Sequence, residues 1–159
     1  MQNVRPTFLT VLCILTFIGS AYSIFQAFSN YTSAAVVADT VPTVIDELKD
    51  QIDAQAKSEK ESEMIDKILS GVEANFTEEK VKNMGLVSGI SSILTLIGAV
   101  LMWGLQKKGY WIYLIGLAAG VIGGAMVYVG IWSGIYVTGS AIIAAIFGLL
   151  YGLNLKHLH

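Results

Sequence analysis

The residues whose chemistry could support catalysis or metal binding are few and scattered along this chain. His157 and His159 stand at the C-terminal end as "HLH", a spacing that could bind a metal ion but is more typical of solvated terminal histidines. Cys13 is the one cysteine, and its apolar neighbours indicate a small packing residue. The sequence contains no Ser/His/Asp set, zinc-ligand spacing or phosphate-binding loop. We therefore expect a protein that is not an enzyme and has no cofactor or metal site.

The carboxylates form the second group with possible chemistry, and all twelve lie between Asp39 and Glu79. Five lysines between Asp39 and Lys80 leave an excess of seven negative charges, which repels phosphate and argues against a nucleic-acid partner. A cation site would need loop geometry that this segment lacks, so a solvated face is favoured. Such a face would suit a basic protein surface. The candidate partner-facing residues are Asp46, Asp50, Asp53, Glu59 and Glu63.

Apolar stretches on either side of this acidic segment predict four membrane-spanning helices. They cover about 7–28, 84–105, 110–132 and 135–155, and none contains Asp, Glu, His, Lys or Arg. About 20 helical residues cross the hydrocarbon core, in which every backbone group needs an internal partner. The first stretch has features of a signal peptide, but its apolar character continues to Phe28, so we expect an anchored helix. The predicted divisions are 1–29, 30–82 and 83–159.

Basic residues predict the orientation of these spans. Arg5, the pair Lys107 and Lys108, and Lys156 all fall on one side of a four-span layout, which would be the cytoplasm. The segment 30–82 would then lie outside. Pro42 suits the first turn of a helix, and apolar residues at helical spacing on both sides of the polar "KSEKESE" predict two amphipathic helices folded back as a hairpin. One unbroken helix is the competing interpretation.

Small residues spaced four apart form bare stripes along the predicted spans. In lipid, helices associate through close contact, so such stripes favour internal packing. A short turn at Ser133 and Gly134 would make the stripes of spans three and four face each other. The alternative is that one stripe faces outward and mediates self-association or docking on another membrane protein. The stripes are Gly19, Ser23 and Ala27; Gly85 and Gly89; Gly116, Gly120 and Gly124; and Ser140, Ala144, Gly148 and Gly152.

Hydroxyl side chains are the remaining polar groups at membrane depth. They could line a polar path, but serine and threonine in such helices more often bond the carbonyl of the preceding turn, which is the favoured interpretation. The residues are Thr10, Thr16, Ser88, Ser91, Ser92, Thr95 and Thr138. Two glycosylation sequons, at Asn30 and Asn75, have meaning only in a eukaryotic secretory pathway.

Two resemblances follow from these features. Four spans with a large first outer loop resemble the layout of claudins and tetraspanins in topology alone, because the loop lacks the tryptophan and cysteines of those families. The opening "RPTFLTVLCILTFIG" is similar to the start of short four-span membrane proteins from Bacteroidota-type bacteria. This second resemblance covers about 15 residues and implies no activity.

We therefore expect an all-α integral membrane protein: a four-helix bundle with an extracytoplasmic amphipathic helical hairpin between spans one and two. It would lie in a bacterial inner membrane with both termini cytoplasmic. The expected function is that of a non-catalytic accessory or scaffold subunit, in contact with lipid and with another membrane protein or a second copy of itself. The alternative is an oligomeric channel or small-solute permeation protein without buried charge.

Overall fold

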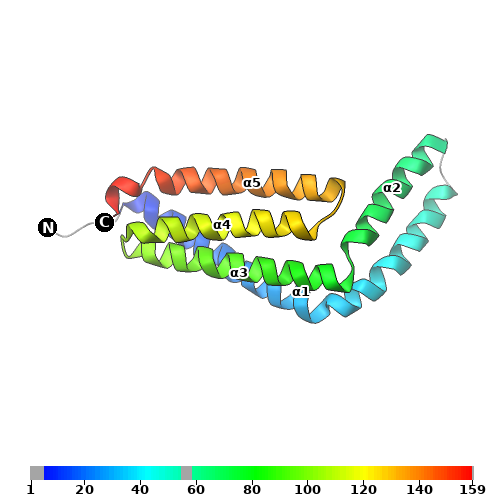
Figure 1. Cartoon of the computed structure of the whole chain (residues 1–159), viewed down its shortest axis with the longest axis horizontal. Helices are drawn as coiled ribbons and strands as arrows, with labels where there is room; N and C mark the ends of the chain where they lie inside the picture. The colour runs from blue at the N-terminus through cyan, green and yellow to red at the C-terminus, as the bar shows by residue number, and fades with distance from the viewer. Residues whose placement is uncertain (1–5, 55–58, 159) are drawn as a thin grey trace.

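The computed structural model describes residues 6–54 and 59–158, and this part of the chain is helical throughout apart from short links (Figure 1). The all-helical class is confirmed, and four helices are long and apolar enough to cross a membrane. The elements are α1 (Thr7–Asp53), α2 (Glu59–Asn75), α3 (Glu78–Trp103), α4 (Lys107–Val127), α5 (Ile131–Gly152) and a final 3₁₀ turn, η1 (Leu155–His157).

Helix α1 continues well beyond the first predicted span. It contains 47 residues, so it is roughly 70 Å long at 1.5 Å per residue, about twice the hydrocarbon thickness. No helix ends near the predicted boundary at residue 29, so the first span and the start of the segment 30–82 belong to one continuous helix. Pro42 lies inside α1 and does not start a new helix. An internal proline removes one backbone hydrogen bond and bends a helix, but the sequence around it contains no glycine to end the helix.

Helix α1 changes direction where it leaves the other long helices (Figure 1). Just before this change of direction, two hydroxyl side chains donate three hydrogen bonds to two backbone carbonyls. Thr32 donates to Phe28 O at 3.0 Å and to Ser29 O at 3.1 Å, and Ser33 donates to Ser29 O at 2.6 Å. Hydroxyls that compete for carbonyls of the preceding turn bend helices, and Pro42 adds a second bending site.

Helix α2 returns alongside the C-terminal half of α1 (Figure 1). It extends to Asn75, so it continues through Gly71, a residue type that often ends helices. Gly71 is needed for a close contact, since a Cβ there would lie 2.8 Å from Nε1 of Trp132 at the start of α5. That indole N–H is buried without a hydrogen-bond partner among the described residues. The contact brings α2 against the end of the bundle.

The links between the later helices differ from the expected ones. Helix α4 begins at Lys107, so the two lysines expected in the link belong to its first turn. It ends at Val127, and the chain turns at Gly130, whose φ of 65° is a conformation that glycine adopts readily. Ser133 and Gly134 therefore lie within α5, not in a turn. The positive φ at Gly130 decides this boundary, which hydropathy alone does not show.

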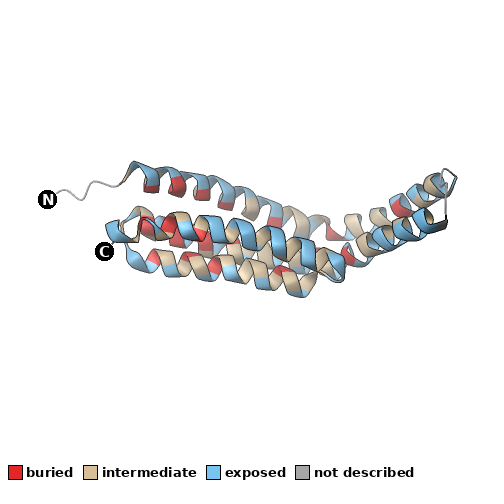
Figure 2. Ribbon diagram, turned by 90° about the horizontal axis from the view of Figure 1, so that it is seen from above, coloured by how far each residue is buried: buried red, intermediate tan, exposed pale blue. Residues whose placement is uncertain are grey.

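The four long helices do not form a closed ring. Helix α3 packs extensively against both α1 and α4, whereas α5 packs mainly against α4. Viewed from above, α1 stands apart from its neighbours over part of its length (Figure 2). Helices α1 and α5 are joined near the chain termini, where the hydroxyls of Thr16 and Tyr151 lie 2.8 Å apart. This arrangement leaves space between α1 and α5 farther along the bundle.

Candidate functional site: a hydroxyl-lined cleft

Helices α3 and α4 meet through direct backbone contact at glycines. A Cβ on Gly98 would lie 2.8 Å from the carbonyl oxygen of Gly109, and a Cβ on Gly109 would lie 2.6 Å from that of Gly98. Farther along α4, a Cβ on Gly116 would lie 2.8 Å from the Thr95 nitrogen, and one on Gly120 would lie 2.7 Å from Ser91 Oγ. The expectation that Gly116 and Gly120 face the fourth span is therefore wrong. Both face α3.

Helices α4 and α5 meet differently, with tyrosines of each helix covering glycines of the other. A Cβ on Gly124 would overlap the ring of Tyr136, whose hydroxyl donates to Gly120 O at 3.1 Å. In the opposite direction, Tyr110 donates to the carbonyl of Gly148 at 3.4 Å, and its hydroxyl lies 3.3 Å from a Cβ built on Gly152. The two small-residue stripes therefore do not touch each other, because aromatic side chains fill the space between them.

The remaining predicted packing residues have mixed environments. A Cβ on Gly85 would lie 2.9 Å from the Ala27 carbonyl oxygen, and one on Gly89 would lie 3.5 Å from Ala27 Cβ, so these residues join α1 to α3. Gly19 has nothing within 4 Å of a built Cβ, because it lines the cavity described below. Ser140 donates back to Tyr136 O of its own helix at 2.6 Å. Ser23 lines a cavity, and Ala144 is partly buried.

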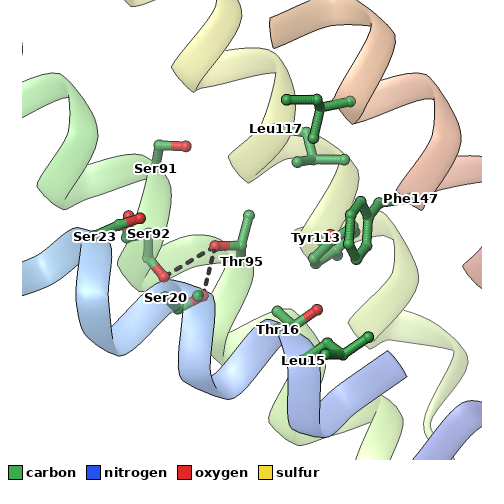
Figure 3. Close-up of a pocket in the computed structure, with 12 residues that line it drawn as sticks. Leu15, Thr16, Ser20, Ser23, Ser91, Ser92, Thr95, Tyr113, Leu117 and Phe147 are labelled. Atoms are coloured by element: carbon green, nitrogen blue, oxygen red, sulfur yellow. Dashed lines mark hydrogen bonds between the residues drawn. The ribbon is translucent and has the colours of Figure 1, made fainter. Parts of the chain in front are cut away.

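A cavity of about 270 Å³ lies between the four long helices (Figure 3). Its hydroxyl-bearing side comes from α1 and α3, and its apolar and aromatic side comes mainly from α4 and α5 (Figure 3). A second cavity of about 220 Å³ shares Ser23, Ser91 and Ser92 with it, so the two adjoin. We call the two together the hydroxyl cleft. Its other polar residues are Thr16, Ser20, Tyr22, Gln26, Ser88, Thr95, Tyr113 and Tyr136.

Some of the cleft hydroxyls are fixed by bonds within the protein. Thr95 donates to Ser92 O at 3.0 Å, so its oxygen accepts from Ser20, 3.3 Å away (Figure 3). Ser91 donates to Gly116 O at 2.7 Å, across from α3 to α4. The expectation that hydroxyls bond their own preceding turn is correct for Thr10, which donates to Pro6 O, and wrong for Ser91. The cross-helix bonds fix the cleft wall in one geometry.

Two hydroxyls in the cleft remain free to bind something else. The side-chain oxygens of Ser23 and Ser92 have no hydrogen-bond partner among the described residues, and both residues line both cavities. Ser92 is only 7% exposed, so its hydroxyl has few surroundings other than the cavity that the residue lines. Ser20 and Thr95 add unused acceptor capacity beside them. The site can therefore both donate and accept hydrogen bonds, and it carries no charge.

The cleft is closed at the end nearest the chain termini. There the side chains of Leu12, Met102 and Tyr151 are 0–3% exposed and form a continuous apolar cluster. Cys13 is fully buried in this cluster and its thiol lies 3.7 Å from Ala99 O, in keeping with a packing role. The side chain of Leu158, just after η1, also packs there. A cluster of this density excludes water from that end of the bundle.

The opposite end of the bundle is fastened by Asn75. Its Oδ1 accepts from the Val129 backbone N–H at 2.8 Å, while its Nδ2 donates to Gly71 O at 2.7 Å and Val129 O at 3.3 Å. The residue is 3% exposed. These bonds join the C-terminal end of α2 to the α4–α5 link. The side-chain nitrogen of the Asn75 sequon is therefore already used in hydrogen bonds within the protein. Asn30, in the other sequon, is partly buried and lines a third, smaller cavity.

The predicted partner-facing carboxylates lie on the two helices outside the bundle. Asp46, Asp50 and Glu63 are exposed, and the side chains of Asp53 and Glu59 lie outside the described part. Within the described residues no group of three His, Cys, Asp or Glu side chains could hold a metal ion. His157 is exposed, and His159 is outside the described residues.

Comparison of this chain with protein-family models, with curated proteins and with solved structures finds no significant match. The functional argument therefore depends on the geometry of the chain itself.

Several residues of the site were not identified from the sequence. Ser20 and Ser23 were absent from the hydroxyl set, although with Thr16 they follow a three-to-four-residue spacing along α1. The α3–α4 contact residues Gly98 and Gly109 were also missed. A glycine every seventh residue, at 109, 116 and 123, was a usable signal, because this spacing keeps a helix face toward one partner. Asn75 had no local signal, since its main partner is 54 positions away.

Proposed function

We propose that this chain is a non-catalytic accessory or scaffold subunit of a membrane complex. It would lie in a bacterial inner membrane with both termini in the cytoplasm, an orientation that Arg5, Lys107, Lys108 and Lys156 support. Its partners would be lipid and another membrane protein or a second copy of itself. The acidic segment formed by α2 and the end of α1 would then project outside and contact a partner there.

The outward face of α5 is the observation that carries this proposal. Its small residues are exposed, and a Cβ on Gly134 or Gly139 would meet nothing within 4 Å. Small residues on a lipid-facing helix allow a second helix to approach closely. Isoleucines flank these positions and form a shallow groove. The face consists of Ile131, Gly134, Ile135, Thr138, Gly139, Ala141, Ile142 and Ala145.

Gentle detergent extraction followed by native mass spectrometry tests the proposal. We expect the wild-type protein to leave the membrane in a complex, and the double variant Gly134→Leu/Gly139→Leu to leave it as a monomer because the added side chains block the groove. Ala118→Leu is the matched control, since it enlarges an exposed position of α4 outside this face. A wild-type protein that is always a lone monomer contradicts the scaffold function.

The hydroxyl cleft favours a second candidate, an oligomeric channel or permeation protein for small uncharged solutes. The buried cluster at the terminal end closes the cleft within one chain, so a continuous path would have to form between copies. Flux of glycerol or urea into liposomes that contain only this protein tests this alternative. Flux above that of empty liposomes supports it, and flux equal to theirs excludes it.

A further inference from the structure

We propose that the hydroxyl cleft is a binding site for an uncharged, membrane-soluble molecule that carries a carbonyl or hydroxyl group next to an apolar body. The inference is independent of the scaffold function, because it concerns the space between α1 and α5 and not the outward face of α5. It depends on the shape of the cleft, on its lack of charge and on its two free hydroxyls.

The position of the cleft determines how a ligand reaches it. Its walls belong to the four spans, and the buried cluster closes the end nearest the termini. Helices α1 and α5 make little contact beyond the Thr16–Tyr151 pair, and both line the cavity, so we infer that the cleft opens sideways between them. In a membrane this opening faces the lipid acyl chains. A molecule already dissolved in the bilayer therefore has direct access.

The absence of charged residues from the cleft walls excludes ions and ionised acids as ligands. The spans contain no Asp, Glu, Lys, Arg or His, so nothing in the wall could neutralise a charged group. An unpaired charge at this depth costs several kcal/mol or more. An uncharged carbonyl or hydroxyl has no such cost when hydroxyls of the protein replace its hydrogen bonds. The ligand is therefore neutral and has one or two polar atoms.

The two walls of the cleft match the two parts of such a molecule. Ser23 and Ser92 provide donors from the α1 and α3 side (Figure 3). Leu117 and Phe147 face the same space from α4 and α5, where an apolar ring or chain would pack (Figure 3). Water alone fits this space poorly, because ordered waters need two to four polar partners each and one wall offers few.

Two sources provide this ligand chemistry in a membrane. One is an isoprenoid quinone, whose ring carbonyls would accept from the serines. The other is a diacylglycerol, whose free hydroxyl and ester carbonyls would do the same. Both are neutral and both are soluble in the bilayer, so the experiment has one arm for each. The probes are a short-chain ubiquinone analogue and 1,2-dioctanoylglycerol.

The first measurement is protection of a cysteine placed in the cleft. In the purified full chain in micelles, Gly19→Cys, at a cleft-lining position with room for a side chain, should react with a membrane-permeant maleimide. A bound probe should slow this reaction at least tenfold in a saturable manner. Thr138→Cys on the outward face of α5 is the control, and its labelling should not change. The native Cys13 is 0% exposed, so the wild-type protein provides the background. If neither probe slows the labelling of the cysteine in the cleft, the proposal is wrong.

The second measurement is equilibrium binding of the probe that protects. Ser92→Ala should weaken binding about tenfold, because it removes a donor that the protein itself does not use, and the fold should be preserved. Ser140→Ala is the matched control, since that hydroxyl bonds its own helix outside the cleft. Equal weakening in both variants would show that the effect is not local and would reject the site. Protection by one probe and not the other identifies which source the cleft accepts.

Discussion

Helix α4 has two long neighbours in its bundle and contacts them in opposite ways. Against α3 it places glycines backbone to backbone, at the pair Gly98 and Gly109. Against α5 it places glycines under tyrosine rings, as Gly124 does under Tyr136. The same residue type therefore produces one interface of main-chain atoms and another of side-chain atoms.

This difference affects how far each interface can adjust to an added side chain. A backbone contact cannot adjust, because any added atom meets a rigid neighbour, whereas a tyrosine ring can rotate about its side-chain bonds. We therefore expect the α3–α4 interface to be the more rigid of the two. Helix α5, on the more adaptable side, carries both the outward small-residue face and one wall of the hydroxyl cleft.

The largest effect should follow from filling the backbone contact. Gly109→Leu should destabilise the protein by at least about 3 kcal/mol, since overpacking against main chain offers no side chain that could move away. Thermal denaturation in micelles, followed by circular dichroism, measures this loss. Ala118→Leu, at an exposed position of α4 outside the α5 face, is the control and should leave the melting temperature unchanged. Equal melting of both variants would contradict the rigid α3–α4 contact.

A smaller effect should follow from filling the tyrosine-covered contact. Gly124→Val should cost about 1–2 kcal/mol, because the Tyr136 ring must move aside but the α5 backbone need not. Thermal denaturation in micelles, followed by circular dichroism, again measures the loss of stability. The double variant Gly124→Val/Tyr136→Leu should recover part of the loss, since the replacement side chain is smaller and more flexible. A loss as large as that of Gly109→Leu would show that the two interfaces are equally rigid.

The smallest effect should follow from removing a single cross-helix hydrogen bond. Tyr136→Phe removes the donor to Gly120 O but keeps the ring in place, so we expect a loss of about 0.6 kcal/mol. Chemical denaturation in mixed micelles can resolve a change of this size when it is compared with the wild-type protein. A loss above about 2 kcal/mol would mean that the hydroxyl, and not the ring, holds α5 on α4.

The sequence alone determined the class of the protein and the position of its apolar helices. Long uncharged runs can satisfy their backbone groups in lipid only as helices, so the four spans follow from composition. The sequence also showed that no charge lies at membrane depth and that all acids are gathered in one segment. These are properties of single residues and of local spacing, which need no knowledge of neighbours.

Only the tertiary structure decided which faces meet. The spacing of Gly116, Gly120 and Gly124 is the same whether they face α3 or α5, because a stripe specifies close approach and not the identity of the approaching helix. The continuation of α1 through Pro42, the turn at Gly130 and the bonds of Asn75 depend on partners distant in sequence or on a single backbone angle. The hydroxyl cleft exists for the same reason: it is the space left when α5 packs on α4 and meets α1 only near Tyr151, an arrangement that no local pattern encodes.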